Sequence, residues 1–257
     1  MEDQDPPGIA LDLDWFDARI STINPQSRAR ANVQHHYDLS RTLYDLFLDE
    51  DSRIPAAIKA EKTRLLRVVR WAVDAFKNGG RLFYSGAGTS GRLGVLDASE
   101  CPPTFRADPE QVQGIIAGGF SALCQAVEGA EDNAEAGAEA VRFREIGKQD
   151  VFIGIAASGR TPFIWGGIWE ANKRGAKTAL LCFNPTLKIP RDNKPNAVIN
   201  PKIGPELLTG STRLKSGTAT KLILNIITTL AMVQMGKVVG NLMVDLDPSN
   251  TKLRDRA

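Results

Sequence analysis

The chain has 257 residues, 42% of them hydrophobic and 24% charged, the proportions of a globular protein with a substantial core. Thirty-two Lys and Arg against thirty Asp and Glu leave a net charge of +2, so no strong field attracts nucleic acid or an anionic membrane. The only two histidines, His35 and His36, are adjacent and point in different directions. This count argues against a zinc hydrolase or a Ser-His-Asp hydrolase and leaves proton transfer to carboxylates, lysines or water.

The cysteine pattern and the apolar stretches indicate the cellular compartment and the solubility of the protein. Cys101, Cys124 and Cys182 lie far apart and form no Cys-x-x-Cys pair, which indicates a reducing compartment. The acidic, proline-bearing start of the chain is unlike a signal peptide. The most apolar stretch, Leu222 to Met235, is interrupted by polar residues, so we expect a buried helix. These features predict a soluble, cytoplasmic α/β protein.

The first predicted elements are helical. Residues 1 to about 12 read as a tail, and apolar residues from Trp15 to about Phe47 have loose helical spacing. An amphipathic helix is predicted from Ala56 to Lys77. Pro55 opens it, and Gly79-Gly80 ends it.

Strands and helices alternate in the rest of the chain. Strands are predicted at 81–85, 112–117, 150–156, 177–182 and 197–200. Helices are predicted from the turn at 86–91 to Pro102-Pro103, and at 133–145, 162–173 and 211–235. This alternation implies right-handed crossovers and a parallel sheet covered by helices on both faces. We therefore expect one α/β domain over residues 56–257, preceded by an N-terminal tail and helical segment over residues 1–55.

The turn Gly86-Ala87-Gly88-Thr89-Ser90-Gly91 follows a predicted strand, opens a helix and matches Gly-x-Gly-x-x-Gly. A dinucleotide site also requires an acidic residue at the end of the next strand, and Ile116-Ala117-Gly118-Gly119 has none. No phosphate-binding P-loop motif occurs either. An anion site remains, built from free helix amides and the Thr89 and Ser90 hydroxyls. The alternative is that the glycines only permit a tight turn.

Two further segments have the same chemistry. Ala156-Ala-Ser-Gly-Arg-Thr-Pro162 also follows a strand and opens a helix, and Thr209-Gly-Ser-Thr-Arg-Leu-Lys-Ser-Gly217 precedes the long helix. In an open parallel sheet, the loops at the carboxyl ends of the strands converge on one crevice. Converging hydroxyls, amides and a guanidinium favour a phosphate monoester as ligand.

Two glutamates flank these loops. Glu100 precedes Pro102-Pro103, and we expect the prolines to end its helix there, where exposed carbonyls and burial favour a neutral acid. Glu131 precedes the next helix, whose N-terminus favours a carboxylate suited to act as a base. Opposed environments of this kind separate acid from base. The alternative is that Glu131 and Asp132 only cap a helix and that Glu100 is solvated.

The motifs together resemble those of the N-acetylmuramic acid 6-phosphate etherases. The resemblance runs nearly continuously from about Gly79 to Arg256, whereas the segment from about Ile23 to Leu48 follows the family poorly. It rests on these blocks: Gly86–Gly94, Asp97–Pro103, Val127–Asp132, Gly154–Pro162, Thr209–Ala219 and Gly236–Asp245. The family is built on the sugar isomerase (SIS) domain, which implies a flavodoxin-like three-layer αβα sandwich with a parallel sheet over residues 56–257. Typical members continue into a small helical domain that carries none of these blocks.

The resemblance also implies a reaction. N-acetylmuramate 6-phosphate would be cleaved with water to N-acetylglucosamine 6-phosphate and D-lactate, by elimination on the open-chain sugar followed by hydration. Glu100 would protonate the departing lactate oxygen, and Glu131 would remove the proton on carbon 2. The phosphate and sugar would be held by Thr89, Ser90, Ser158, Gly159, Arg160 and Thr161. The resemblance implies a reaction without a metal or a cofactor. It also implies a homodimer with the active site near its interface.

Two other functions fit parts of this pattern. A non-catalytic sugar-phosphate regulator resembling glucokinase regulatory protein shares several motifs, but such proteins have two SIS domains, and Glu100 and Glu131 together favour catalysis. An SIS isomerase acting on sugar phosphates is the second alternative. A transcription regulator is disfavoured, because no helix-turn-helix is evident.

Overall fold

The structure, a computed structural model, describes residues 41–192 and 194–244. Four features from the sequence lie outside these ranges: most of the helical spacing from Trp15, both histidines, the tail at residues 1–12, and the last part of the family resemblance. The predicted domain boundary between residues 55 and 56 stays a prediction.

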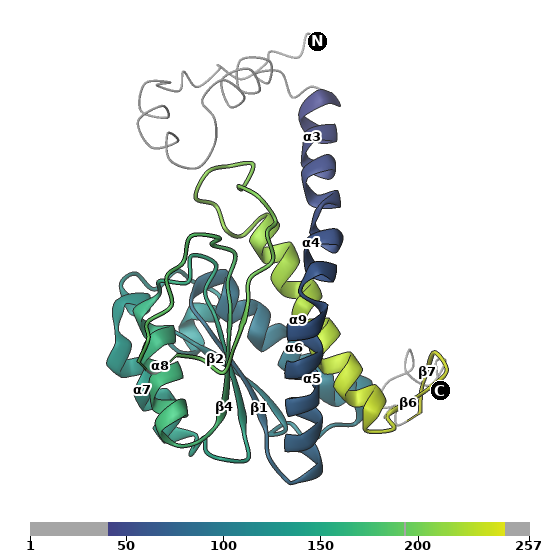
Figure 1. The fold of residues 1–257 in the computed structure, drawn as a ribbon, viewed down its shortest axis with the longest axis vertical. Coiled ribbons are helices and arrows are strands. Elements are labelled where there is room, and N and C mark those ends of the chain that lie inside the picture. Colours follow the sequence, from purple (N-terminus) through teal and green to yellow (C-terminus); the bar gives the residue numbers. More distant parts are fainter. Residues whose placement is uncertain (1–40, 193, 245–257) are drawn as a thin grey trace, which may run out of the picture.

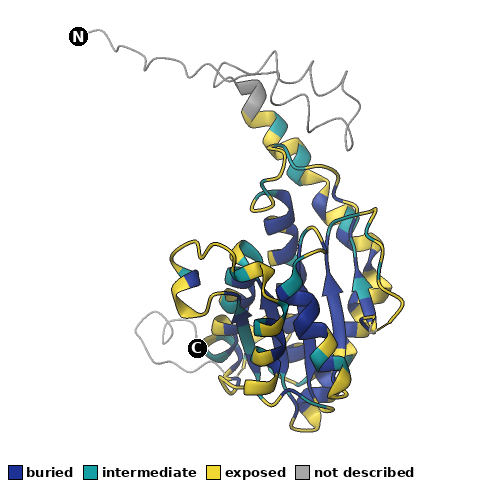
Figure 2. Ribbon diagram, turned by 90° about the vertical axis from the view of Figure 1, so that its left-hand side faces the viewer, coloured by how far each residue is buried: buried dark blue, intermediate teal, exposed yellow. Residues whose placement is uncertain are grey.

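A column of three helices leads into the domain: α3 (Arg41–Ser52), α4 (Ile54–Ala60) and α5 (Lys62–Lys77) (Figure 1). The single helix predicted from Ala56 to Lys77 is thus two helices, which meet at Glu61. Pro55 lies in the first turn of α4, where a proline is well tolerated because that turn has free amides anyway. Ile54 and Ile58 pack in the core, so α4 belongs to the packed body, whereas α3 projects from it (Figure 2).

The centre of the protein is a parallel sheet of five strands in the order β2-β1-β3-β4-β5. The strands are β1 (Leu82–Gly86), β2 (Val112–Ile116), β3 (Val151–Ile155), β4 (Lys177–Leu181) and β5 (Ala197–Ile199). All five predicted strands are present, with ends that differ by at most one residue. β1 and β3 are buried along their whole length, as expected for central strands covered on both faces.

Helices cover both faces of this sheet, which confirms the three-layer αβα sandwich (Figure 1). One hydrophobic cluster joins the sheet to α5, α6 (Gly88–Phe105) and α9 (Lys215–Gln234). A second joins the opposite face to α7 (Ala134–Phe143) and α8 (Pro162–Lys173). Figure 2 shows the resulting pattern, with buried residues through the strands and exposed residues on the outer helix surfaces.

Helix α9 begins four residues later than predicted and packs against α5 and α6. By length and composition alone it could cross a membrane, and no other helix in the described part of the chain could. Its Ile223, Leu224, Ile227 and Ala231 are fully buried in the protein core, in agreement with the expected buried helix.

A short antiparallel hairpin follows α9: β6 (Val238–Val239) and β7 (Leu242–Met243). The sequence analysis did not predict it, because two-residue strands are too short to show an alternating pattern. The three cysteines are all free thiols; Cys101 and Cys182 are buried, and Cys124 is exposed.

Candidate active site

The predicted anion-binding loops lie at the point where the strand order reverses. β1 pairs with both β2 and β3 in parallel, and Gly86 at the end of β1 is in register with Ile155 at the end of β3. The chain leaves β1 for α6 on one face and β3 for α8 on the other. Two loops on opposite sides of such a point leave a crevice between them, which is where open α/β sheets bind ligands.

The first loop places Thr89 and Ser90 in the first turn of α6. Both are partly exposed, and no side chain caps the helix, so the first amides remain available to an anion. Gly91 allows this geometry, because a Cβ there would lie 2.6 Å from Cγ1 of Ile116 and 2.7 Å from the carbonyl oxygen of Gly86. The glycine therefore brings the helix N-terminus directly against the strand end.

The second loop is held in place by its own contacts. The indole of Trp165 donates to the carbonyl of Gly159 (2.8 Å), and the side-chain amide of Asn184 donates to the carbonyl of Ser158 (3.0 Å). Gly159 has φ +69°, and a Cβ there would lie 2.3 Å from the Leu187 side chain. Ser158 and Arg160 are exposed, and Thr161 precedes α8 without capping it. The loop thus presents an exposed hydroxyl and an exposed guanidinium between the end of β3 and the uncapped start of α8.

The third predicted segment differs, because the protein fills this helix N-terminus itself. The amides of Lys215 and Ser216 donate to the carboxylate of Glu206 (2.8 and 2.9 Å), as does the Ser216 hydroxyl (2.6 Å). A Cβ on Gly217 would lie 3.6 Å from Cγ2 of Thr89, so the start of α9 lies beside the first loop. The expected anion chemistry is therefore present here, but a carboxylate of the same chain uses it.

Glu100 is not at the end of its helix, which corrects the prediction. α6 continues through Pro102 and Pro103 to Phe105, and Arg106 ends it in the left-handed conformation with φ +50°. Prolines fit here because their φ is close to helical, although their missing amides cost two hydrogen bonds. Buried Phe105 anchors the last turn in the core. Glu100 is exposed, so the expected burial at a helix end does not occur in the single chain.

Glu131 lies in a short 3-10 helix, η2 (Ala130–Asp132), directly before α7. It does not cap α7: Asn133 does, accepting a hydrogen bond from the amide of Ala136 (2.9 Å). Glu131 is exposed, and η2 packs against α8, the helix opened by the second loop. The capping alternative for Glu131 is therefore wrong, and its carboxylate is free of that structural role.

The structure brings the two open loops together but places Glu100 away from them. Glu100 lies twelve residues after Gly88, about 18 Å along the axis, since a helix rises by about 1.5 Å per residue. It is also on the α6 face of the sheet, whereas Glu131 lies against α8 on the other. Within one chain, the two glutamates do not form a pair.

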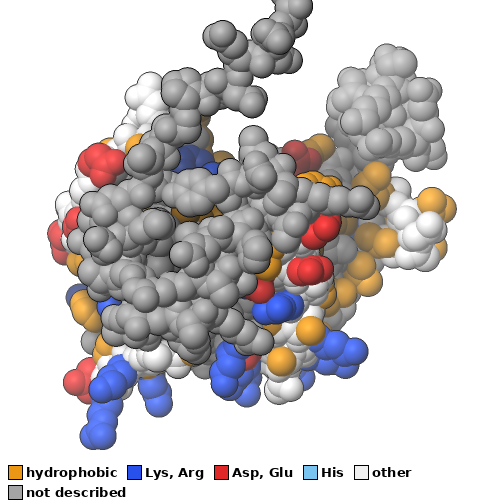
Figure 3. All heavy atoms as spheres, turned by 90° about the horizontal axis from the view of Figure 1, so that it is seen from above, with side chains coloured by type: hydrophobic (Ala, Val, Ile, Leu, Met, Phe, Trp, Pro, Cys, Tyr) orange, Lys and Arg blue, Asp and Glu red, His pale blue; other side chains and the backbone are white. Residues whose placement is uncertain are grey.

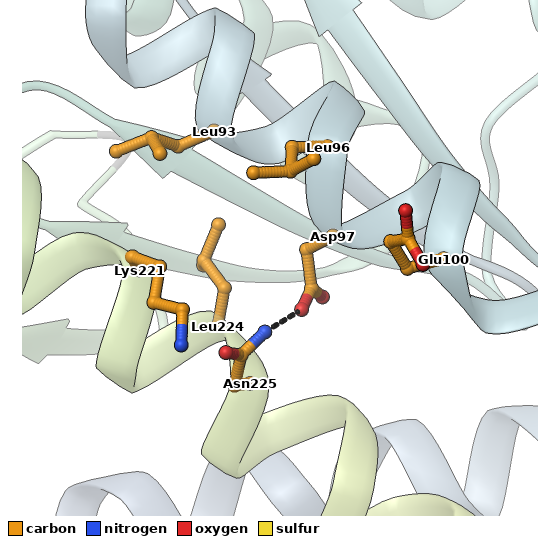
Figure 4. Close-up of a pocket in the computed structure, with 7 residues that line it drawn as sticks. All are labelled: Leu93, Leu96, Asp97, Glu100, Lys221, Leu224 and Asn225. Atoms are coloured by element: carbon orange, nitrogen blue, oxygen red, sulfur yellow. Dashed lines mark hydrogen bonds between the residues drawn. The ribbon is translucent and has the colours of Figure 1, made fainter. Parts of the chain in front are cut away.

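A cavity of about 200 Å³ lies beside Glu100, between α6 and α9 (Figure 4). Its walls combine leucines with polar groups: Leu93, Leu96, Asp97 and Glu100 from α6, and Lys221, Leu224 and Asn225 from α9. The sequence analysis assigned no role to Asp97, Lys221 or Asn225. The signal was present in α9, where Lys221 and Asn225 are polar residues four apart and therefore lie on the same face of the helix.

Asp97 is the buried member of this cavity. Its Oδ1 accepts hydrogen bonds from the side chains of Asn225 (2.7 Å) and Thr228 (3.3 Å). Burial raises the pKa of Asp97, and these hydrogen bonds act in the opposite direction. Burial, followed by the charge of Asp97, raises the pKa of Tyr84 well above its ordinary value. Burial and the same carboxylate raise the pKa of the Cys101 thiol to about 12.

Charged side chains of both signs appear on the described surface at the end from which α3 projects (Figure 3). This agrees with the small net charge of the sequence. Among the described residues, no group of three or more His, Cys, Asp or Glu side chains has the arrangement of a metal site.

Comparison with known proteins supports both the fold and the family. The model of the glucokinase regulatory protein N-terminal SIS domain matches residues 64–171. A solved structure of phosphoheptose isomerase from Neisseria gonorrhoeae is similar in fold, with a TM-score of 0.51 and 14% identity over 74% of this chain and 96% of that one.

Curated relatives are much closer in sequence. An N-acetylmuramic acid 6-phosphate etherase from Gloeobacter violaceus is 54% identical over 91% of this chain and 74% of its own length. One from Cutibacterium acnes is 53% identical over 82% of this chain and 69% of its own. Identity at this level over most of both chains shows that the chain belongs to the N-acetylmuramic acid 6-phosphate etherase family.

Proposed function

We propose that this protein is an enzyme, a lyase that cleaves the D-lactyl ether of N-acetylmuramate 6-phosphate to give N-acetylglucosamine 6-phosphate and D-lactate. The observation that carries this proposal is the 54% identity to a curated etherase over 91% of the chain. The geometry agrees with it, because two open helix N-termini at the sheet switch point suit the phosphate of a sugar. The free thiols agree with work in the cytoplasm.

The reaction proceeds in two steps on the open-chain sugar. Glu131 removes the proton on carbon 2, the bond between carbon 3 and the ether oxygen breaks, and Glu100 gives that oxygen a proton as lactate leaves. Water then adds to carbon 3 of the unsaturated aldehyde. Thr89, Ser90 and the residues from Ser158 to Thr161 hold the phosphate and sugar meanwhile. Neither step needs a redox change or a metal ion.

The proposed site is shared between two copies of the chain. With its phosphate at Thr89 and Ser90, a hexose is too short to reach Glu100 of the same chain, about 15–17 Å along α6. A second copy supplies Glu100 if its α6 faces the loops of the first. Homodimerisation therefore completes the site, and dimers of this kind are symmetric, with two equivalent sites.

The deciding experiment incubates the purified protein with N-acetylmuramate 6-phosphate and measures released D-lactate. Glu100→Gln and Glu131→Gln should each lower turnover by about a hundredfold or more, because each removes a proton-transfer group. Substrate binding should largely survive. Glu139→Gln, an exposed change on α7, is the control and should leave turnover unchanged. Wild-type turnover in both glutamate variants would refute their assigned roles.

Mixing two inactive variants tests the shared site. If Glu100 and the phosphate loops come from different chains, Glu100→Gln mixed with a loop variant such as Ser90→Tyr regains activity. Statistical mixing gives about one quarter of the wild-type rate, since half of the dimers have one intact site. Mixtures that form heterodimers without regaining activity would show that each site belongs to one chain.

The matched family model is named for a regulatory protein, so a non-catalytic sugar-phosphate sensor is the other candidate. The same assay separates the two. A sensor binds the sugar phosphate at micromolar concentration and releases no lactate, whereas an etherase releases lactate in proportion to the enzyme added.

A further inference from the structure

The segment of α6 that carries Glu100 is weaker than the rest of the helix. Pro102 and Pro103 have no amide hydrogen to donate to the carbonyls of Ala98 and Ser99, four residues earlier. Both of these missing hydrogen bonds would have spanned Glu100. The backbone alone therefore holds this turn less firmly than an uninterrupted helix would.

Asp97, one turn before Glu100, is the side chain that ties this segment to the rest of the protein. It is buried, with 6% of its surface exposed, and its Oδ1 accepts from Asn225 of α9 (Figure 4). Thr228 of the same helix donates to this oxygen as well. The Cys101 thiol, on the far side of Glu100, in turn contacts the backbone carbonyl of Asp97 (3.3 Å). Asp97 and Cys101, the two residues that share a helix face next to Glu100, are thus both held by hydrogen bonds.

The strand beneath α6 adds a third group. The Tyr84 hydroxyl of β1 is fully buried and close enough to Asp97 for each to shift the pKa of the other. A hydrogen bond between this hydroxyl and the Asp97 carboxylate contributes to both shifts, but its geometry is poor, and neither the hydroxyl nor Oδ2 of Asp97 has another partner among the described residues. Burying two oxygens whose hydrogen bonds are poorly formed costs free energy. A cost of this kind is tolerated where polar groups serve the function.

We propose that Asp97 is a positioning residue, which holds the Glu100 turn of α6 against α9 and so fixes the proton donor for lactate departure. The inference rests on the proposed function. Asp97 itself touches no reacting atom in this proposal; it acts through the backbone of the next turn. Charged or titratable groups that face it are Tyr84 from β1, Cys101 and Glu100 from α6, and Lys221 from α9.

The test separates the two proton transfers. In deuterium oxide, exchange of the carbon 2 proton needs Glu131, whereas lactate release also needs Glu100. Asp97→Ala should lower lactate release by about a hundredfold, the cost of a small misplacement, and leave carbon 2 exchange within about threefold of wild type. Asp97→Asn keeps the acceptor oxygen and should restore most of the release. Ser99→Ala, a neighbouring exposed change, is the control.

Three outcomes would overturn the inference: equal loss of both steps in Asp97→Ala, Asp97→Asn as slow as Asp97→Ala, or wild-type release in Asp97→Ala. If Asp97→Ala does not fold, Asn225→Ala removes a donor from the same contact and should show the same split to a smaller degree. Amide hydrogen exchange over residues 98–106 supplies a readout without substrate, and should speed up in either variant. This exchange tests whether Asp97 holds the Glu100 turn even if the wild type releases no lactate. Absence of lactate release would count against the proposed function alone.

Discussion

The N-termini of α6 and α8 differ from those of α7 and α9 in what satisfies their free amides. α6 and α8 have no side-chain cap, and both begin at the sheet switch point. α7 is capped by Asn133, and α9 by Glu206. The open termini are therefore available to a ligand, and the filled ones hold the fold together.

The comparison shows that the same residue types can serve either purpose. The segment before α9 has the Ser, Thr, Gly and cationic residues of the two open loops. Its amides are nevertheless filled, because a carboxylate nine residues before Lys215 reaches them. Lys215, only 1% exposed, is held in turn by Glu50 of α3 (2.6 Å) and by the carbonyl of Pro205 (3.1 Å). The filled terminus thus joins the start of α9 and the loop before it to α3, which is distant in the sequence.

The largest effect on stability is expected at this filled terminus. Glu50→Ala leaves the ammonium of Lys215 buried without its ionic partner, and such a change lowers the free energy of unfolding by about 3–5 kcal/mol. Urea denaturation measures it. Asp49→Ala, the exposed neighbour, should change stability by about 0.5 kcal/mol or less. Equal stability of the two variants would mean that the pair does not hold α3 to α9.

A smaller loss is expected for Glu206→Ala, about 1–2 kcal/mol, the usual cost of removing a helix cap. Glu206→Gln keeps one acceptor oxygen and should lose less. Because the α9 terminus serves the fold, neither variant should weaken binding of inorganic phosphate, measured by calorimetry. Weaker phosphate binding in both variants would show that the N-terminus of α9 also binds the ligand, and would refute the distinction between open and filled termini.

The open termini should show the reverse behaviour. Arg160→Met removes an exposed guanidinium from the second loop and should weaken phosphate binding about tenfold, or about 1.4 kcal/mol. The free energy of unfolding should change by about 0.5 kcal/mol or less. Arg70→Met, an exposed change on α5, should alter neither quantity. An Arg160→Met variant that unfolds easily and binds phosphate normally would contradict the comparison.

The smallest effect concerns the thiols, two of which are buried and one of which is exposed. Exposed Cys124 should react with a thiol reagent in the folded protein, and Cys101 and Cys182 only after unfolding. Burial raises the pKa of Cys101 from 9.0 to about 12 and that of Cys182 to about 11. A raised pKa adds stability that is fully present below pH 9.0 and is lost as the pH rises toward these values. Stability that stays constant from pH 8.5 to about 11 would refute this expectation.

Much of the fold could be predicted because it rests on local patterns. All five strands follow from short apolar runs, and α8 has the predicted bounds, since a proline opens it and a glycine lies just beyond its end. The end of α6 could not be predicted, because Phe105 packs in the core and carries the helix through two prolines that ordinarily end one. The β6–β7 hairpin left no periodic signal.

The candidate site divides in the same way. The loops at Thr89 and Ser158 were predictable, because glycine, hydroxyls and a strand-to-helix turn lie within a few residues of one another. Asp97 and Glu206 were not, because their partners Asn225 and Lys215 are 128 and nine residues away in the sequence. Neither contact follows from a periodic pattern within one helix or strand, because each joins two different segments of the chain.

The sequence by itself determined the family, the parallel sheet and the two loops that open α6 and α8, because each depends on residues close together in the chain. Only the tertiary structure decided which helix N-termini stay open and how far Glu100 lies from the loops. Both depend on where α6 and α9 pack on the sheet, and packing joins residues that the sequence keeps apart.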